Sequence, residues 1–337
     1  AIENYNKAES LGYDNAEMYE IMASVFLEED DPAQALRNIN RAIALSPLEG
    51  NLRIFKVRVY LAYDKFNEAL ATLDDMEKIL PDAFEVYDLK SQIYLGQGNY
   101  QKAIETVNKG CARFPKDAGL ALIKLRILVE SSKTDLAYEL INEMKKNGMY
   151  EEQLKDTSVI EATLLIQDNK IDDAQNVLKN AHESLPQDED ILYLIVDLNG
   201  KIGKYEEVLK YSQELIELEP QQFYLATAMY FYAVALEETG NKEEALKIFK
   251  NITVKLRKMT IDTPAFYEGY LYRLLSHTKL GEYDKALELA EYVENLYPEK
   301  SDAHAFKYFI YKEMGDMDSA TNEKVLAQSV NPELILD

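Results

Sequence analysis

The sequence predicts an all-α fold made of repeated pairs of helices. Apolar residues recur at helical spacing along most of the 337-residue chain, and no segment alternates apolar and polar residues as a half-buried strand would. A small residue also returns at a nearly constant interval, which indicates an internal repeat. These observations favour one array of helical repeats over the two globular domains that the length alone would suggest.

The repeating small residue sets the period of the chain. Successive intervals are 34, 34, 34, 37, 34, 37, 41 and 34 residues, a spacing that unrelated segments would not share. Two antiparallel helices approach closely where one presents a small side chain, and large residues on the next turn then interlock with the partner helix. We call these places the anchor positions: Ala35, Ala69, Ala103, Ala137, Ala174, Val208, Ala245, Ala286 and Ala320.

Each repeat is expected to consist of a helix, a turn and a second helix. In the first repeat, apolar periodicity covers 16–28 and 32–45, and a polar turn separates the two segments. Glycine in such turns permits the left-handed backbone that ends a helix, and proline closes most repeats because it cannot continue a helix interior. The turn glycines are Gly98, Gly203, Gly240, Gly281 and Gly315, and the closing prolines are Pro47, Pro81, Pro115, Pro186, Pro220, Pro298 and Pro332.

The spacing gives about nine repeats. We expect repeats 1–4 in residues 16–154, repeats 5–7 in residues 155–266, and repeats 8–9 with the C-terminal end in residues 267–337. Residues 1–15 match the second helix of a preceding or capping repeat, so the chain starts inside a repeat. The repeats begin near Ala16, Gly50, Phe84, Ala118, Lys155, Glu189, Ala226, Tyr267 and Ser301.

Two stretches interrupt the regular spacing. Extra residues lengthen the joint at 146–151, and an extended joint at 254–264 continues the second helix of repeat 7 before a Thr-Pro turn. Each stretch is either a local irregularity or a hinge between two sub-arrays, and the sequence leaves both alternatives open. A hinge would show as separable unfolding, because repeat arrays are stabilised by contacts between nearest neighbours.

The composition argues against several classes of function. The chain carries 37 Lys and Arg against 60 Asp and Glu, a formal net charge of −23, which disfavours direct contact with nucleic acid. One cysteine excludes an intrachain disulfide, and three histidines leave little for a metal site. The first residues lack the regions of a leader peptide, and the longest nearly apolar stretch, 224–236, is too short for membrane insertion. Cytoplasm is the default location, although a trimmed exported or anchored protein would look the same.

No catalytic constellation is expected. Gly96 and Gly98 superficially suggest a phosphate loop, but no strand precedes them and they fall in an expected interhelix turn. His277 and His304 occupy aromatic positions of the repeat, where core imidazoles are expected, and His182 is expected to face solvent. Pairs of carboxylates are numerous at helix ends and turns, so none identifies a hydrolase. We expect neither a cofactor nor a metal.

The repeat pattern resembles that of the tetratricopeptide repeat family, whose signature spreads aromatic, small and proline residues over 34 positions. The chain departs from the signature in having no Trp and in replacing Leu-Gly almost everywhere. The resemblance implies a right-handed superhelical α-solenoid of helix-turn-helix repeats. Matching residues are Tyr19, Ala23, Phe26, Ala35, Ile39, Ala42 and Pro47 in the first repeat, and Tyr87, Tyr94, Tyr100, Ala103, Val107, Gly110 and Pro115 in the third.

The resemblance also implies a concave groove, lined by the first helix of each repeat, that binds extended or helical peptide segments. Acidic residues of the early repeats, such as Glu20 and Asp88, would favour a basic flank on the partner. An exposed apolar stripe in the late repeats would mark a partner site, whereas burial between neighbouring repeats is an equally open alternative. The predicted groove residues are Arg58, Arg126, Tyr193, Tyr230, Val234, Leu271, Leu275 and Phe309.

The leading functional hypothesis is a non-enzymatic scaffold that binds a protein or peptide segment in this groove. The alternative is a sensor or regulatory repeat domain of a larger protein, whose effector module lies upstream of the chain. An enzyme that uses scattered carboxylates is a third hypothesis, which no spacing supports. Family members that clamp a C-terminal carboxylate use a set of Lys, Asn and Arg residues on three consecutive repeats, and this chain lacks that set. The sequence identifies neither the partner nor the oligomeric state.

Overall fold

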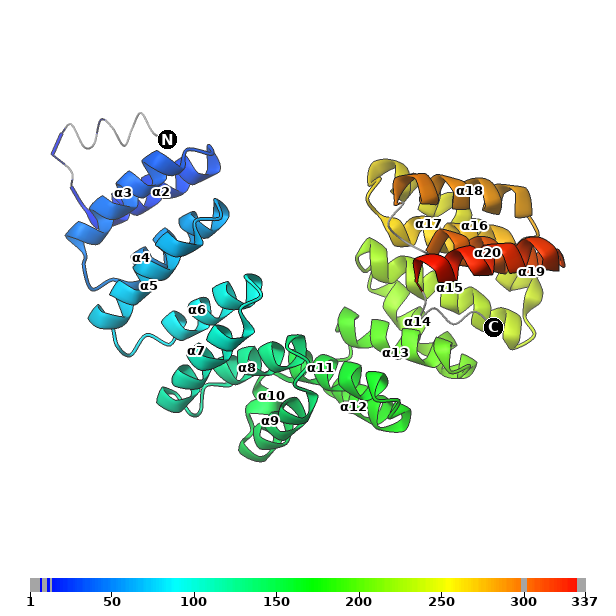
Figure 1. Ribbon diagram of the computed structural model, residues 1–337, viewed down its shortest axis with the longest axis horizontal. Helices are drawn as coiled ribbons and strands as arrows, with labels where there is room; N and C mark the ends of the chain where they lie inside the picture. The colour runs from blue at the N-terminus through cyan, green and yellow to red at the C-terminus, as the bar shows by residue number, and fades with distance from the viewer. Residues whose placement is uncertain (1–6, 8–10, 13, 298–301, 332–337) are drawn as a thin grey trace. The chain divides into compact units, whose positions relative to one another are not determined.

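The computed structural model of the chain describes residues 7, 11–12, 14–297 and 302–331 (Figure 1). Within these ranges the backbone forms nineteen helices and no strand, which confirms the predicted all-α repeat fold. The predicted helix at 1–15 lies almost wholly outside the described residues, as do Pro298, Ser301 and Pro332. None of the helices in the described ranges is both long and apolar enough to cross a lipid bilayer.

The helices fall into two compact units, 1–160 and 161–337, and the division lies inside α11 (Leu154–Gln167). Unit 1 holds the start of α11 together with α2 (Ala16–Glu28), α3 (Pro32–Leu45), α4 (Gly50–Ala62), α5 (Phe66–Ile79), α6 (Glu85–Gly96), α7 (Tyr100–Arg113), α8 (Ala118–Glu130), α9 (Thr134–Asn147) and α10 (Met149–Glu152). Unit 2 holds the rest of α11 together with α12 (Ile171–Ser184), α13 (Glu189–Lys201), α14 (Tyr205–Glu217), α15 (Gln222–Glu238), α16 (Lys242–Asp262), α17 (Tyr267–Lys279), α18 (Tyr283–Leu296), α19 (Asp302–Met314) and α20 (Met317–Val330). The predicted grouping into 16–154, 155–266 and 267–337 stays a prediction.

All nine anchor positions are buried, as the repeat spacing predicts. Consecutive helices contact one another from α2 to α9 and from α12 to α20. Tyr19 of α2 and Ile39 of α3 pack with Leu52 of α4, so a helix pair shares its core with the next pair. Each unit is therefore held together by a series of apolar clusters between neighbouring helices, as expected for a repeat protein.

A left-handed residue lies five positions before every anchor position. Glycine fills this place in five repeats, with φ between 68° and 92°. Short polar residues fill it in the other four, where φ lies between 54° and 60°, although this conformation costs an L-residue about 1–2 kcal/mol. The glycines alone are visible in the sequence as turn signals. The four other left-handed residues are Asp30, Asp64, Ser132 and Asn169.

Both irregular stretches are largely helical. At 146–151, α9 ends at the left-handed Gly148, and α10 follows with Met149 and Tyr150 buried. At 254–264, α16 runs on to a total of 21 residues, whereas the other second helices have 13 or 14. The first helix α15 has 17 residues, against 12 to 14 in the others. The two alternatives for each stretch, a local irregularity or a hinge, both stay open.

Candidate functional site

Five aromatic side chains gather on three neighbouring helices of unit 2. They are Tyr193 on α13, Phe223, Tyr224 and Tyr230 on α15, and Tyr272 on α17. The centroid of the Tyr193 ring lies 5.0 Å from that of Phe223 and 5.2 Å from that of Tyr224. The centroids of Tyr230 and Tyr272 lie 5.1 Å apart. We call this half-buried set the aromatic face.

The length of α15 brings the aromatic face together. This helix is apolar nearly all round, as expected for a helix that α13, α14, α16 and α17 all contact. The extra turn at its start carries Phe223 and Tyr224, which reach Tyr193 of the preceding repeat. Further along, Tyr230 meets Tyr272 of the following repeat. Aromatic pairs at such distances contribute about 0.5–1.5 kcal/mol beyond the area that they bury.

Hydroxyl groups give the aromatic face polar contacts. Tyr224 donates a hydrogen bond to the carboxylate of Asp190, and the hydroxyl oxygens of Thr227 and Tyr272 lie 3.2 Å apart. Burial is the main cause that raises the pKa of Tyr193 above its usual value. This hydroxyl therefore stays protonated near neutral pH and can donate a hydrogen bond to a bound molecule.

Carboxylates give the aromatic face a negative field. After burial, the charges of Asp197 and Glu268 raise the pKa of both Tyr193 and Tyr272, so both carboxylates lie close to the rings. Asp197 Oδ2 also lies 2.7 Å from the Nζ atom of Lys201, which balances part of its charge. Such a surface suits a ligand with apolar and cationic parts, because the rings accept apolar groups and attract cations across their faces.

The structure places six of the eight predicted groove residues in unit 2, and Tyr193 and Tyr230 belong to the aromatic face. Val234 packs half-buried against the core cluster that α15 and α16 share. Leu275 packs in the same way against the cluster of α17 and α18, and Leu271 is also half-buried. The sequence left open whether the apolar groove residues are exposed or buried between neighbouring repeats. All five apolar or aromatic residues named in this paragraph are half-buried, so burial holds in part.

The other three predicted residues are exposed. Phe309 on α19 keeps 41% of its surface exposed, and its ring centroid lies 5.1 Å from that of Tyr308. Arg58 on α4 and Arg126 on α8 are exposed residues of unit 1. Arg126 Nη2 lies 2.7 Å from Asp156 Oδ1 in an ion pair. A role of the eight residues in partner binding stays a prediction.

Three members of the aromatic face, Phe223, Tyr224 and Tyr272, are missing from the predicted groove. Phe223 and Tyr224 were missed because the prediction has repeat 7 begin near Ala226, whereas α15 begins one turn earlier, at Gln222. Tyr272 was missed because its place in the face depends on its contact with Tyr230 of the preceding repeat. The signal that points to Tyr224 and Tyr272 is the abundance of tyrosine, with 24 copies in the chain. That abundance exceeds what the repeat signature requires, and tyrosine is common at interfaces.

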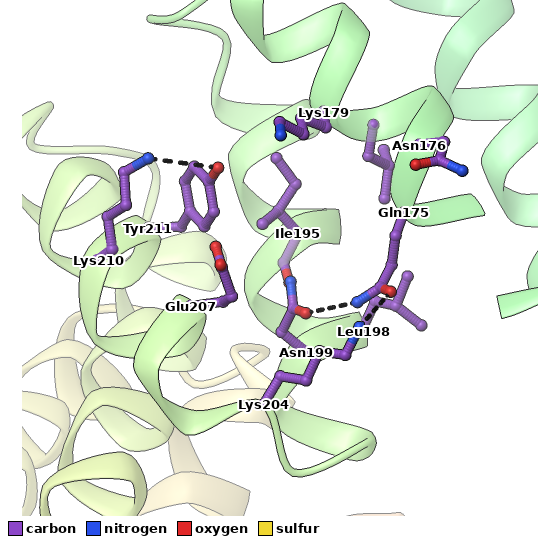
Figure 2. A pocket seen from close by; sticks show the side chains of 11 residues that line it. Gln175, Asn176, Lys179, Ile195, Leu198, Asn199, Lys204, Glu207, Lys210 and Tyr211 are labelled. Carbon is purple, nitrogen blue, oxygen red and sulfur yellow. Dashed lines mark hydrogen bonds between the residues drawn. The ribbon is translucent and has the colours of Figure 1, made fainter. Parts of the chain in front are cut away.

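A separate polar cavity of about 350 Å³ lies among α12, α13 and α14 of unit 2 (Figure 2). Gln175 Nε2 donates a hydrogen bond to Asn199 Oδ1 at 2.8 Å, and Lys204 Nζ donates one to Gln175 Oε1 at 2.6 Å. Lys210 and Tyr211 lie on the opposite side of the cavity in Figure 2. The amide, ammonium, carboxylate and hydroxyl groups of the lining suit the binding of a polar group.

The histidines are packed beside carboxylates. His277 Nδ1 lies 2.7 Å from Glu282 Oε2, and His304 is half-buried in a similar contact. The prediction that His182 faces solvent is wrong, because Tyr211 of the next repeat packs edge-on against its ring and leaves 12% of the side chain exposed. Among the described residues, no group of three His, Cys, Asp or Glu side chains is placed to hold a metal ion.

Comparison with known proteins identifies the repeat. Residues 26–93 and 84–117 match two family models that are both described as tetratricopeptide repeat. The chain contains tetratricopeptide repeats. Residues 125–149 also match a model described as PPR repeat. Tetratricopeptide repeats generally mediate contacts between proteins, and proteins built from them are generally non-catalytic.

Individual similar proteins cover parts of the tetratricopeptide array. Cell division cycle protein 27 homolog A of Arabidopsis thaliana is 27% identical over 104 residues, which are 31% of this chain and 14% of that protein. The PilF structure of Pseudomonas aeruginosa has 14% identity, a TM-score of 0.51, and covers 66% of this chain and 96% of its own. A tetratricopeptide repeat protein from Parabacteroides merdae is 16% identical and has a TM-score of 0.48. The match covers 70% of this chain and 91% of that protein. The likeness to PilF shows the fold alone.

Proposed function

We propose that this tetratricopeptide repeat chain is a non-catalytic scaffold that binds a segment of another protein on the aromatic face of unit 2. The observation that carries the proposal is the convergence of aromatic rings from α13, α15 and α17, the first helices of three consecutive repeats. Tyrosine is enriched among the few residues that dominate binding energy at protein interfaces. A face with several tyrosines on rigid helices provides such residues in a fixed arrangement.

The chemistry of the aromatic face indicates what the bound segment contains. An apolar side chain of the partner would contact the rings of Tyr193, Tyr230 and Tyr272. A lysine or arginine beside it would approach Asp197 and Glu268, the carboxylates that border these rings. A cation near an aromatic ring gains about 0.5–2 kcal/mol, depending on how far it is desolvated.

Unit 1, taken by itself, carries a group of carboxylates that suits a basic segment of a partner protein. Burial is the main cause that raises the pKa of Asp88 on α6, and a hydrogen bond from Gln92 partly opposes this rise. The negative charges of Asp117 and Glu85 raise the pKa of Asp88 further. These carboxylates therefore lie close enough to repel one another. A cationic segment would relieve this repulsion, and its association with unit 1 would weaken as salt increases.

The reactive side chains favour binding over catalysis. Burial raises the pKa of the Cys111 thiol, which disfavours the nucleophilic thiolate. His277 is held by Glu282, which itself pairs with Lys285 at 2.9 Å, so this imidazole has a structural partner. Neither Cys111 nor His277 belongs to the aromatic face.

The proposal is tested by selecting peptides from a displayed random library on the full chain. The dissociation constant of the best peptide is then measured by fluorescence polarisation for the wild type and for Tyr193→Ala and Tyr272→Ala. We expect each substitution to weaken binding roughly tenfold or more, as truncation of an interface tyrosine does. Enrichment of peptides with lysine or arginine beside an apolar residue is also expected.

The matched control is Tyr100→Ala, which truncates an exposed tyrosine of α7 in unit 1. Circular dichroism and thermal unfolding of each variant establish that it folds. Equal affinity of the wild type, Tyr193→Ala and Tyr272→Ala would rule out the aromatic face as the binding site. If only Tyr100→Ala lost affinity, the peptide would bind at a surface that includes Tyr100 and not at the aromatic face.

A further inference from the structure

A second cavity of unit 2, about 640 Å³ in volume, lies among α16, α17 and α18. Four of the side chains that line it are cationic: Lys250 and Arg257 of α16, Arg273 of α17 and Lys285 of α18. Two glutamates also line it, so the formal charge of the lining is about +2 by ordinary protonation at neutral pH. A positive cavity is unexpected in a chain whose formal net charge is −23.

The two guanidinium groups of this cavity have no carboxylate partner among the residues that the structure describes. Arg273 Nε is buried without a hydrogen-bond partner, and within the described part of the chain neither Arg257 nor Arg273 forms an ion pair. Burial, and then the positive charge of Arg257, lowers the pKa of Arg273, so the two guanidinium groups lie close together. Arg273 is half-buried and Arg257 is exposed. An unpaired charge is costly to bury, so an anion bound between the two groups would offset the burial of Arg273.

One of the two glutamates that line the cavity already has partners. Glu282 Oε1 lies 2.9 Å from Lys285 Nζ, and Glu282 Oε2 lies 2.7 Å from His277 Nδ1. Hydrogen bonds from Lys285 and then from His277 lower the pKa of Glu282. Glu282 therefore pairs with Lys285 and His277 and not with the guanidinium groups. Glu288, the other glutamate of the lining, is exposed and forms no ion pair with Arg257 or Arg273 in the described part of the chain.

The extension of α16 supplies half of the guanidinium pair. Second helices of 14 residues, such as α18, would end before position 257, whereas α16 continues to Asp262. Arg257 follows Lys250 by seven residues, which places both on one face of the helix. Beside them, Val254 is 67% exposed and Tyr292 of α18 is 48% exposed, so the cavity also has an apolar rim.

We propose that this cavity binds the dianionic phosphate group of a phosphomonoester. Arg257 and Arg273 would hold the phosphate oxygens, because planar guanidinium groups bind phosphate through paired hydrogen bonds. Lys250 and Lys285 add charge at the sides, and Val254 and Tyr292 contact the organic part of the ligand. The dianion matches the charge of the lining. This site is separate from the aromatic face and does not depend on the peptide-binding proposal.

The test measures binding of phenyl phosphate to the full chain by isothermal titration calorimetry at pH 8 and low salt. Wild-type binding in the micromolar to low millimolar range is expected. Arg257→Gln and Arg273→Gln are each expected to weaken it at least tenfold, because a charge-assisted contact to the phosphate is lost. The matched control is Lys258→Gln, which removes the same charge from the same helix at an exposed position outside the cavity.

Two further ligands test the charge and the source of the phosphate. Phenyl sulfonate, a monoanion of similar shape, is expected to bind at least fivefold more weakly than phenyl phosphate. A phosphotyrosine peptide that binds more tightly than phenyl phosphate would assign the site to phosphorylated protein segments, and equal affinity would assign it to small phosphomonoesters. No detectable binding of phenyl phosphate, or the same loss in Lys258→Gln as in Arg257→Gln, would overturn the proposal. Thermal unfolding of each variant separates lost binding from lost folding.

Discussion

The rings of Tyr230 and Tyr272 lie 5.1 Å apart, at an angle of 33°, between α15 and α17 of unit 2. Each tyrosine belongs to the first helix of its own repeat, so the contact joins two consecutive repeats. The Tyr272 hydroxyl oxygen also lies 3.2 Å from that of Thr227 on α15. Repeat proteins owe their cooperativity to contacts between neighbouring repeats. The same pair therefore stabilises the array and forms part of the proposed binding site.

Removing the Tyr272 ring is expected to destabilise unit 2. Tyr272→Ala should lower the free energy of unfolding by about 2–3 kcal/mol, because a half-buried aromatic side chain is lost and leaves a partial cavity. Tyr272→Phe keeps the ring and loses only the hydroxyl contact, so it should cost about 1 kcal/mol or less. Urea denaturation measures both values. Equal destabilisation by the two variants would mean that the ring contact contributes little.

The left-handed turn positions should respond to substitution according to their φ angle. Gly281 has a φ of 70°, so Gly281→Ala is expected to destabilise the fold by about 1 kcal/mol. Ser132→Gly, at a φ of 56°, should stabilise it by up to about 1 kcal/mol. The control is Gly96→Ala at a helical position with open space around the added Cβ. If Gly281→Ala and Gly96→Ala have the same stability in thermal unfolding, the turn conformation is not under strain.

Gly110 should not tolerate a side chain, although it lies within a helix. A Cβ at this position of α7 would lie 2.8 Å from the Cβ of Tyr87 on α6, an atom that cannot rotate away. Gly110→Ala is therefore expected to cost about 1–3 kcal/mol in chemical denaturation, despite the higher helix propensity of alanine. A gain in stability, as propensity alone predicts, would show that α6 and α7 can separate without cost.

Lys90 should make unit 1 sensitive to acid. This buried side chain of α6 places Nζ 2.6 Å from Asp74 Oδ1 and 2.5 Å from Glu77 Oε2. The hydrogen bond from Lys90 is the main cause that lowers the pKa of Glu77. A lowered folded-state pKa means that the stabilisation is present above the unfolded-state pKa of about 4.3 and is lost as the pH falls through the folded-state value.

Replacement of Lys90 should therefore cost more at neutral pH than in acid. Lys90→Met is expected to lower the free energy of unfolding by about 1–2 kcal/mol at pH 7, and this difference from the wild type should shrink as the pH approaches 3. Lys78→Met, which removes an exposed ion pair with Asp75, should cost less than about 0.5 kcal/mol at either pH. A difference for Lys90→Met that stays constant with pH would contradict the assigned pairing.

The helical framework could be predicted from the sequence because close packing of helix pairs restricts the anchor positions. At Ala35 and Ala286 the partner helix leaves no exposed surface, so only a small residue fits and the spacing becomes visible. The left-handed turns could be predicted only where glycine fills them. Asp64 and Asn169 adopt the same conformation, but both residue types are common in other turns and carry no unique signal.

The aromatic face could be predicted only in part, because it depends on where one helix begins. Tyr193 and Tyr230 follow from repeat spacing. Phe223 enters the face through the additional turn of α15, and Tyr272 enters it through the contact with Tyr230 across two repeats. The pairing of Arg257 with Arg273 likewise depends on the length of α16 and on its packing against α17. The residue pattern within one repeat does not reveal such contacts between repeats.

The location of the proposed binding site is tested most directly by hydrogen–deuterium exchange of the full chain with and without a saturating concentration of the selected peptide. Binding to the aromatic face predicts slower exchange in α13, α15 and α17, the helices that carry Tyr193, Tyr230 and Tyr272, because bound peptide suppresses local opening of these helices. Protection confined to other helices, with unchanged exchange in these three, would contradict the assignment of the aromatic face as the protein-binding site.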